Sequence, residues 1–220
     1  MALMSMAEGT TEYNANIPRS LAQTAQVWYY SVDRQSIIYN TPVETGKQLD
    51  AKQGKLAEYQ GTCGIVSCVN VLRLAGRATT TEEELVHYAS GNGTLCVSGM
   101  TPFRNGGTTP QNRKALLAAF GIESELYPSS IDSIAQYVED GRGVIISVDA
   151  GKLWGLPCFY RNLHAVTVTS VQRSKSGDLE GFYLCDSGTS GKDYARFYSA
   201  VHLEQALSKR SMNVTTSIIR

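Results

Sequence analysis

Residues 62–72 read TCGIVSCVNVL, a stretch that sets two cysteines around an apolar run. Apolar side chains recur in it at helical spacing, at Ile65, Cys68, Val69 and Leu72. This period predicts a mostly buried helix over residues 65–75 that ends at a glycine. For Cys63 and Cys68 three interpretations are open at this point: buried core thiols, half of a metal site, or a nucleophile at a helix start.

The size and composition of the chain suit a single domain, or one domain with an added segment. It has 220 residues, of which 42% are hydrophobic and 18% charged, and its formal net charge is zero. A neutral chain offers no electrostatic footprint for nucleic acid or for an anionic membrane. No apolar run approaches the ~20 residues of a membrane-spanning helix. The oligomeric state is left open.

The first residues, MALMSMAEGTTE, contain neither a basic n-region nor a continuous apolar h-region. They therefore do not resemble a secretory signal peptide. We expect synthesis in the cytoplasm without a cleaved signal peptide, and later export or injection as an effector is left open.

Cysteine and histidine usage argues against a disulfide framework and against a metal site. The chain has five cysteines, an odd number, and no Cys-x-x-Cys. Its three histidines provide no pair that could complete a zinc site. We therefore expect reduced thiols, no metal and no cofactor. Within residues 62–72, Cys68 falls on the apolar side of the helix and is expected to be a small core residue.

Helix signals dominate the first half of the chain, and strand signals dominate the second. Capping residues mark three helix starts: Thr81 ahead of residues 82–89, Thr109 ahead of 111–120, and Ser130 ahead of 131–139. β-Branched and aromatic runs predict strands at 27–40, 143–150, 164–173 and 181–187, and two later strands at 194–201 and 212–220 around a short helix at 203–209.

This order of elements predicts an α+β domain, in which a helical half faces an antiparallel sheet half. Residues 1–57 are expected to be an N-terminal extension packed on, or leading into, a domain formed by residues 58–220. A cleft between two such halves is a natural substrate site.

His164 is the histidine best placed for chemistry. His87 lies in a helix among glutamates and His202 lies at the start of the late helix, so both are expected to be solvated. His164 begins a strongly β-forming run directly after a loop, where a side chain is held rigidly and is still reached by solvent. Taken alone, it could equally be a hydrogen-bonded core histidine.

Cys63 and His164 together predict a thiol nucleophile with its base. A helix N-terminus and a nearby imidazolium both stabilise a thiolate, and Gly64 leaves access to the sulfur unobstructed. Asp186 ends the strand that a hairpin pairs with the His164 strand, so it is the candidate to orient the imidazole, although alone it could be a turn carboxylate. Gln60 could join the Cys63 backbone N–H in an oxyanion hole, or be a polar loop residue.

Four segments carry a family resemblance: QGTCGIVSCVNVLRLAG (60–76), GGTTPQNRKALLAAFGI (106–122), LHAVTVTSV (163–171) and GFYLCDSG (181–188). In this order they resemble papain-like cysteine peptidases, most of all the branch that processes bacteriocin leaders, and the related papain-fold domains of bacterial toxins and effectors. The resemblance implies Cys63 as nucleophile, His164 as general base and acid, and Asp186 as orienting residue. The oxyanion glutamine of the family usually lies further upstream, where this chain has Ala57. Gln60, or Gln53 folding back, would have to take its place.

The resemblance implies a peptidase that cleaves a protein or peptide substrate through a thioester acyl-enzyme. The same chemistry serves glutamine deamidation, transglutamination and acyl transfer in papain-fold effectors, and a non-catalytic binding domain is a third interpretation. Trp154, Phe159 and Tyr160 precede His164 in a loop and are expected either to wall the substrate cleft or to pack that loop.

Overall fold

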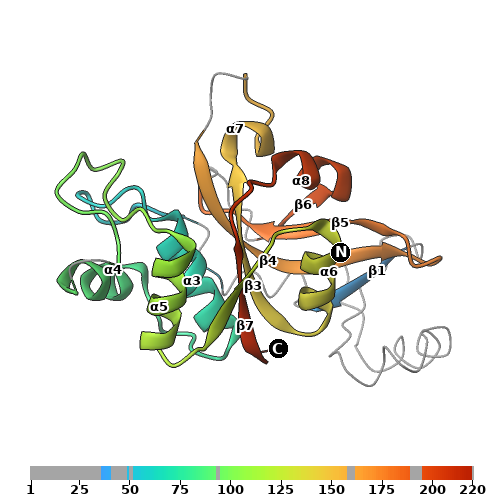
Figure 1. The fold of residues 1–220 in the computed structure, drawn as a ribbon, viewed down its shortest axis with the longest axis horizontal. Coiled ribbons are helices and arrows are strands. Elements are labelled where there is room, and N and C mark those ends of the chain that lie inside the picture. The colour runs from blue at the N-terminus through green and yellow to red at the C-terminus, as the bar shows by residue number, and fades with distance from the viewer. Residues whose placement is uncertain are drawn as a thin grey trace, which may run out of the picture.

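The computed structural model describes residues 36–40, 49, 52–92, 95–157, 162–188 and 195–219. These residues form a seven-stranded antiparallel sheet with helices on both faces (Figure 1). The strands are β1 (Ser36–Asn40), β2 (Ser124–Tyr127), β3 (Arg142–Asp149), β4 (Leu163–Ser174), β5 (Leu179–Cys185), β6 (Arg196–Ser199) and β7 (Met212–Ile218). The helices are α3 (Cys63–Leu74), α4 (Glu82–Gly91), α5 (Pro110–Ala119), α6 (Ile131–Glu139), α7 (Ala150–Leu153) and α8 (Ala200–Ala206). Within the described ranges no helix is long and apolar enough to cross a membrane.

The strand β4 organises the sheet. Neighbouring strands follow the order β2-β7-β3-β4-β5-β6, and β1 pairs separately with β4. The first half of β4 pairs with β3, and its second half pairs with both β5 and β1. Part of the expected N-terminal extension, residues 36–40, therefore adds a strand to the main sheet.

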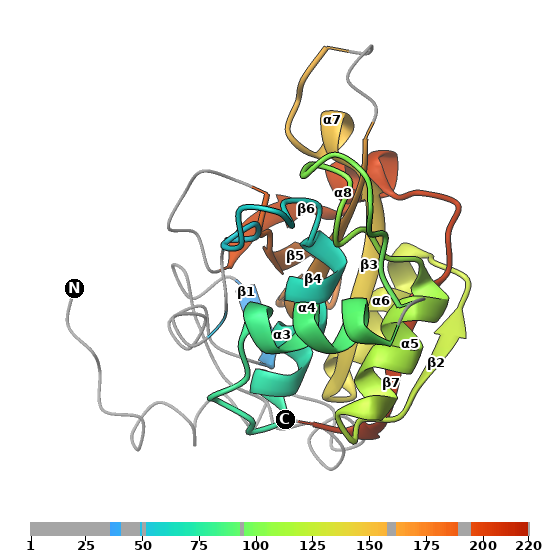
Figure 2. The same cartoon turned by 90° about the vertical axis from the view of Figure 1, so that its left-hand side faces the viewer.

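The helices α3, α4 and α5 cover one face of the sheet, as Figure 2 shows from the helical side. Apolar side chains of these helices pack against Ile145 of β3 and Ala165 of β4. Cys68 belongs to this core and is fully buried, as its helical position predicts. Because successive side chains of a strand point to opposite faces, the neighbours of Ile145 in β3 serve the other core.

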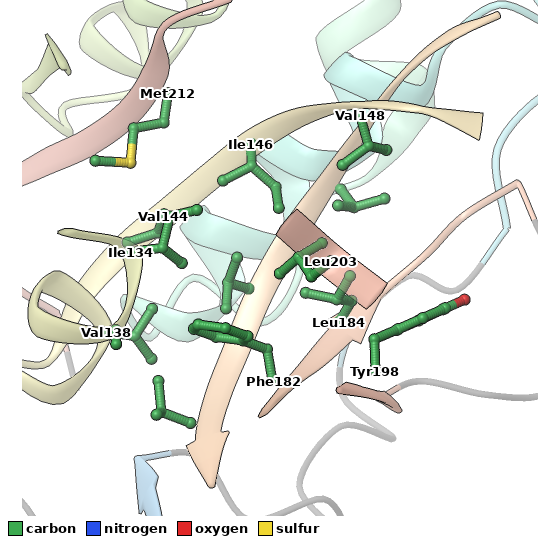
Figure 3. Packing of buried hydrophobic residues seen from close by; sticks show 14 of the residues in the cluster. Ile134, Val138, Val144, Ile146, Val148, Phe182, Leu184, Tyr198, Leu203 and Met212 are labelled. Atoms are coloured by element: carbon green, nitrogen blue, oxygen red, sulfur yellow. The ribbon is translucent and has the colours of Figure 1, made fainter. Parts of the chain in front are cut away.

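That second core lies between the sheet and the helices α6 and α8 (Figure 3). β3 contributes Val144, Ile146 and Val148 to it, and β5 contributes Phe182 and Leu184. β3 is thus buried on both faces, which explains why its sequence is a nearly continuous apolar run and does not alternate. Helices on both faces hold the middle strands rigidly.

The predicted α+β architecture is confirmed, and so are the three capped helix starts. Backbone N–H groups donate to the capping hydroxyls at each: Glu84 to Thr81, Asn112 to Thr109 and Ser133 to Ser130. The late helix lies earlier than predicted, at 200–206, because the Ser199 hydroxyl caps it by accepting from the His202 N–H. The short elements β2 and α7 were not predicted.

Candidate active site

Cys63 is the first residue of α3, so its thiol lies at a helix N-terminus. The hydroxyl of the preceding Thr62 does not cap this helix but hydrogen-bonds to the buried carboxylate of Glu82. The N–H groups of the first turn, which have no intrahelical partner, are therefore free of a side-chain cap and favour a negative charge nearby. Cys63 itself is only half-buried.

Hydrogen bonds fix α3 to the strands beneath it. The hydroxyl of Thr167 in β4 donates to the Ser67 carbonyl at 3.2 Å, and the Asn70 amide donates to the Cys185 sulfur of β5 at 3.3 Å. These contacts set the height of α3 over the two strands that carry the other candidate residues.

His164 is the second residue of β4, opposite Val148 of β3, and it is 6% exposed. Its Nε2 lies 2.7 Å from Oδ1 of Asp186. Since Nε2 is engaged there, Nδ1 is the ring nitrogen left to interact with the Cys63 thiol, whose pKa the His164 ring lowers. The structure thus brings the three residues predicted from the sequence together: Cys63 and His164 line one pocket, and His164 bonds Asp186.

Asp186 directly follows β5, is 1% exposed and accepts hydrogen bonds on both carboxylate oxygens. His164 Nε2 and the Gly188 N–H, at 2.9 Å, bond to Oδ1, and the Trp154 indole N–H donates to Oδ2 at 2.7 Å. A buried carboxylate with several donors is strongly oriented, and it stays ionised. It therefore holds the His164 ring in one tautomer and one rotation.

The pKa values of the three groups shift in the direction of a thiolate–imidazolium pair. Burial alone would raise the pKa of Cys63, but the hydrogen bond and charge of His164, the Ala165 N–H and the Arg113 charge hold it below its usual value. Burial would lower the pKa of His164, but its hydrogen bonds and the charges of Asp186 and Cys63 raise it to about 10. Burial would raise the pKa of Asp186, and its three donors lower it.

Trp154 packs near the His164 ring and donates a hydrogen bond to the Asp186 carboxylate. It follows α7, and its ring centroid lies 5.3 Å from that of His164. A Cβ on Gly188 would lie 2.9 Å from His164 Cε1 and 2.8 Å from the Trp154 ring, so only glycine lets these groups approach. A role of Trp154 as a wall of the substrate cleft stays a prediction, and Phe159 and Tyr160 lie outside the described residues.

Gln60 is half-buried, and its side-chain amide donates to the Ala57 carbonyl at 3.4 Å. Its assignment to an oxyanion hole stays a prediction. Gln53 joins the two sides of the site instead: its amide donates to the Gln60 carbonyl at 2.9 Å, and its amide oxygen accepts from the Ser187 hydroxyl at 3.0 Å. Its backbone N–H also donates to the Ser187 carbonyl at 3.1 Å. Gln53 thereby ties the segment before Cys63 to the turn after Asp186.

Sequence reasoning missed two buried charges near the site, Glu82 and Arg113. Glu82 is 1% exposed and accepts from the Gly54 N–H at 2.7 Å and the Lys55 N–H at 3.2 Å, besides its contact with Thr62. It fixes the loop that leads into α3. The sequence shows Glu82 only as an acidic residue of a helix start, a pattern that does not reveal burial.

In the part of the chain that the structure describes, no three His, Cys, Asp or Glu side chains gather as a metal site.

Comparison with known proteins identifies the fold. No protein-family model and no curated protein matches the sequence. Among solved structures, a protein of Bacillus anthracis described as a C39-like peptidase matches at a TM-score of 0.53 and 16% identity, over 76% of this chain and 94% of its own. The chain has the papain-like fold of C39-like peptidases. A double-glycine-motif protease from an AMS/PCAT transporter, solved with its leader peptide, matches at a TM-score of 0.47 and 13% identity, over 77% of this chain and 97% of its own.

Proposed function

We propose that the protein is a cysteine peptidase with Cys63 as nucleophile, His164 as general base and acid, and Asp186 as the residue that orients His164. The supporting observation is that Cys63 and His164 line the same pocket while the His164 ring bonds the buried Asp186 carboxylate at 2.7 Å. A lowered thiol pKa at a helix start and a buried orienting carboxylate are what thiol catalysis requires.

The acylation step follows from this arrangement. The Cys63 thiolate attacks the carbonyl carbon of the scissile bond, and the oxygen becomes an oxyanion within reach of the uncapped N–H groups at the start of α3. The His164 imidazolium gives its Nδ1 proton to the leaving nitrogen, so the C–N bond breaks, a neutral amine departs, and a thioester remains on Cys63.

Deacylation reverses the role of the imidazole. Neutral His164 accepts a proton at Nδ1 from water, and the hydroxide that forms attacks the thioester carbonyl. The carbon–sulfur bond breaks, a carboxylic acid is released, and the thiolate–imidazolium pair is restored. Asp186 keeps Nε2 protonated throughout and stabilises the positive ring.

Replacement of Cys63 tests the proposal, with a second cysteine of the same helix as control. We expect Cys63→Ala to abolish the appearance of new peptide termini in a peptide library analysed by mass spectrometry, while its thermal unfolding stays close to that of the wild type. Cys68→Ala should keep turnover, because Cys68 lies in the core. Turnover that survives in Cys63→Ala would contradict the proposal. A gain of ~1 Da on glutamine, without new termini, would assign the thioester chemistry to deamidation.

The pH dependence of alkylation gives an independent check. Iodoacetamide should label Cys63 well below the ~8.5 at which a free cysteine ionises. In His164→Gln the burial of the thiol is no longer opposed by the imidazolium, so the labelling midpoint should move upward in pH. Identical profiles for the two proteins would show that His164 does not activate the thiol.

A further inference from the structure

A pocket of about 270 Å³ opens beside the Cys63 sulfur. Its wall is formed by the start of β4 on one side and by the segment that leads into α5 on the other, with Arg113, Ser147 and Arg210 completing it. The volume lies below the roughly 300–1,000 Å³ of sites that enclose drug-sized ligands, so the pocket suits one side chain of a bound peptide.

Arg113 presents a buried positive charge to this pocket. The residue is 2% exposed, and among the described residues its guanidinium donates to two neutral groups: Nε to Asn213 Oδ1 at 2.9 Å and Nη2 to Ser147 Oγ at 3.0 Å. Within the described ranges it has no carboxylate within ion-pair distance. A guanidinium has five N–H donors, and a buried charge without a counterion is costly. Among the described residues the guanidinium thus has no carboxylate partner of the kind that buried arginines normally have.

The orientation of Arg113 is fixed in advance. Asn213, which accepts from Nε, is itself held by donating to the Pro110 carbonyl at 2.8 Å. Asn213 and Ser147 belong to β7 and β3, two neighbouring central strands. A donor set held in this way loses little conformational entropy when it binds an anion.

A second arginine lines the same pocket. Arg210 lies in the exposed segment before β7 and is close enough for its charge to act on that of Arg113. The pocket lining contains no acidic side chain. The wall also includes Thr108, whose hydroxyl is buried without a hydrogen-bond partner among the described residues. The Cys63 thiolate also acts on the charge of Arg113, but the thiolate and the His164 imidazolium cancel each other, so the lining keeps the positive charges of Arg113 and Arg210.

We propose that this pocket is a specificity site for a carboxylate of the substrate, carried by an Asp or Glu side chain close to the scissile bond. Arg113 binds the carboxylate from the buried end of the pocket, here called its floor, and Arg210 binds it from the solvent-exposed end, here called its rim. The inference rests on the proposed function in one respect, the position of the scissile bond at Cys63. The attraction between the two arginines and a carboxylate does not depend on whether Cys63 cleaves the peptide.

Matched peptides test the charge preference apart from the thiol chemistry. We would titrate N-acetylated pentapeptide amides into the Cys63→Ala variant, with Glu or Gln at each position in turn. The Glu peptide should bind roughly tenfold to a hundredfold more tightly at one position, the range of one charge-assisted hydrogen bond. A third arm compares a neutral pentapeptide with a free and with an amidated C-terminus. Equal binding of Glu and Gln peptides would overturn the inference, and a preference for the free terminus alone would reassign the pocket to a chain end.

Charge reversal at the rim supplies the decisive variant, because Arg210 is exposed and its replacement spares the core. In Arg210→Glu the ratio of Glu to Gln binding should fall at least fivefold, with a further fall in Arg113→Gln if that variant folds. Arg196→Glu changes the net charge equally but lies outside this pocket, so its ratio should equal that of the parent. If the ratio of Glu to Gln binding stays unchanged in Arg210→Glu, Arg210 does not bind the substrate carboxylate.

Reactive peptides connect the pocket to catalysis. Peptidyl vinyl sulfones that differ only by Glu or Gln next to the electrophile should label wild-type Cys63 at rates that differ in the same ratio. If Cys63 reacts with neither probe nor with iodoacetamide, the proposed function fails, and the titrations still decide the pocket. If both probes react equally fast and the titrations show no preference, the pocket inference fails and the function stands.

Discussion

Replacing Trp154 by Phe tests whether the indole N–H supports the Asp186 carboxylate. The N–H donates to Oδ2 at 2.7 Å, and the carboxylate is 1% exposed. Phe keeps an aromatic ring behind His164 but removes this donor. We therefore expect both a loss of stability and slower turnover, because Asp186 holds the imidazole less firmly.

The size of the effect follows from the kind of bond. A hydrogen bond to a charged group contributes about 1.5–3 kcal/mol, more than the roughly 0.5–1.5 kcal/mol of a neutral one. For a domain of this size the larger loss lowers Tm by roughly 3–12 °C. The smaller ring of Phe adds a packing loss of its own, so the hydrogen bond must be measured separately.

A double-mutant cycle separates the two contributions. Urea unfolding of Trp154→Phe, Asp186→Asn and the double variant gives the coupling energy between the indole and the carboxylate, in which the packing loss of the ring cancels. Tyr183→Phe is the control. It removes an aromatic donor that bonds neutral Gln172 at 2.9 Å, away from the site, so turnover should stay at the wild-type level.

The coupling energy from that cycle decides whether the indole N–H stabilises Asp186. A coupling energy below ~0.5 kcal/mol, the size of an ordinary surface effect, would show that the indole N–H does not stabilise the carboxylate. Turnover in Trp154→Phe that equals that of Tyr183→Phe would refute its link to His164.

Three further substitutions probe the support of the site. Asp186→Asn should lower the free energy of unfolding by roughly 3–5 kcal/mol. The loss should be largest between pH about 4 and 6.5. Above pH about 4 the lowered pKa of Asp186 stabilises the folded state, and below pH about 6.5 the raised pKa of His164 stabilises it too. A loss that is constant from pH 3 to 10 in urea unfolding would be inconsistent with this pair. Glu82→Gln should cost about 1.5–3 kcal/mol and slow peptide turnover by loosening the loop before α3, and wild-type turnover would exclude a positioning role. Gly188→Ala should cost about 1–3 kcal/mol in thermal unfolding through its clash with His164, whereas Gly91→Ala, with open space around it, should cost nothing; equal effects would disprove the clash.

Local patterns were enough to predict much of the fold. The apolar period of residues 62–72, the capping hydroxyl of Thr109 and the β-branched run from His164 onward each depend on side chains a few residues apart. Such patterns survive in the tertiary structure because they match the burial of each element. Short or weakly patterned elements escaped prediction: β2 has four residues, and α7 has a single turn.

The candidate site was predicted only as far as residue type and strand order allow. Cys63, His164 and Asp186 each mark the end of a patterned element, so their approach follows from pairing the elements correctly. Gln53 and Gln60 show where prediction from the sequence stops. Both are polar residues of an irregular segment, and their hydrogen bonds join groups as far apart in the chain as residues 53 and 187. Nothing in the local sequence distinguishes such a partner from a solvated loop amide.

The sequence by itself determined the α+β class, the helix start at Cys63 and the strand that begins at His164, because hydrophobic period, capping and β-propensity act over a few residues. Only the tertiary structure decided which polar groups are buried and what each one faces. Trp154 became a donor to Asp186, and Arg113 became a buried charge beside the nucleophile with no carboxylate partner among the described residues. The physical reason is that burial and pairing of a charge are set by elements distant in the chain, whose packing fixes the desolvation and the neighbours of each group.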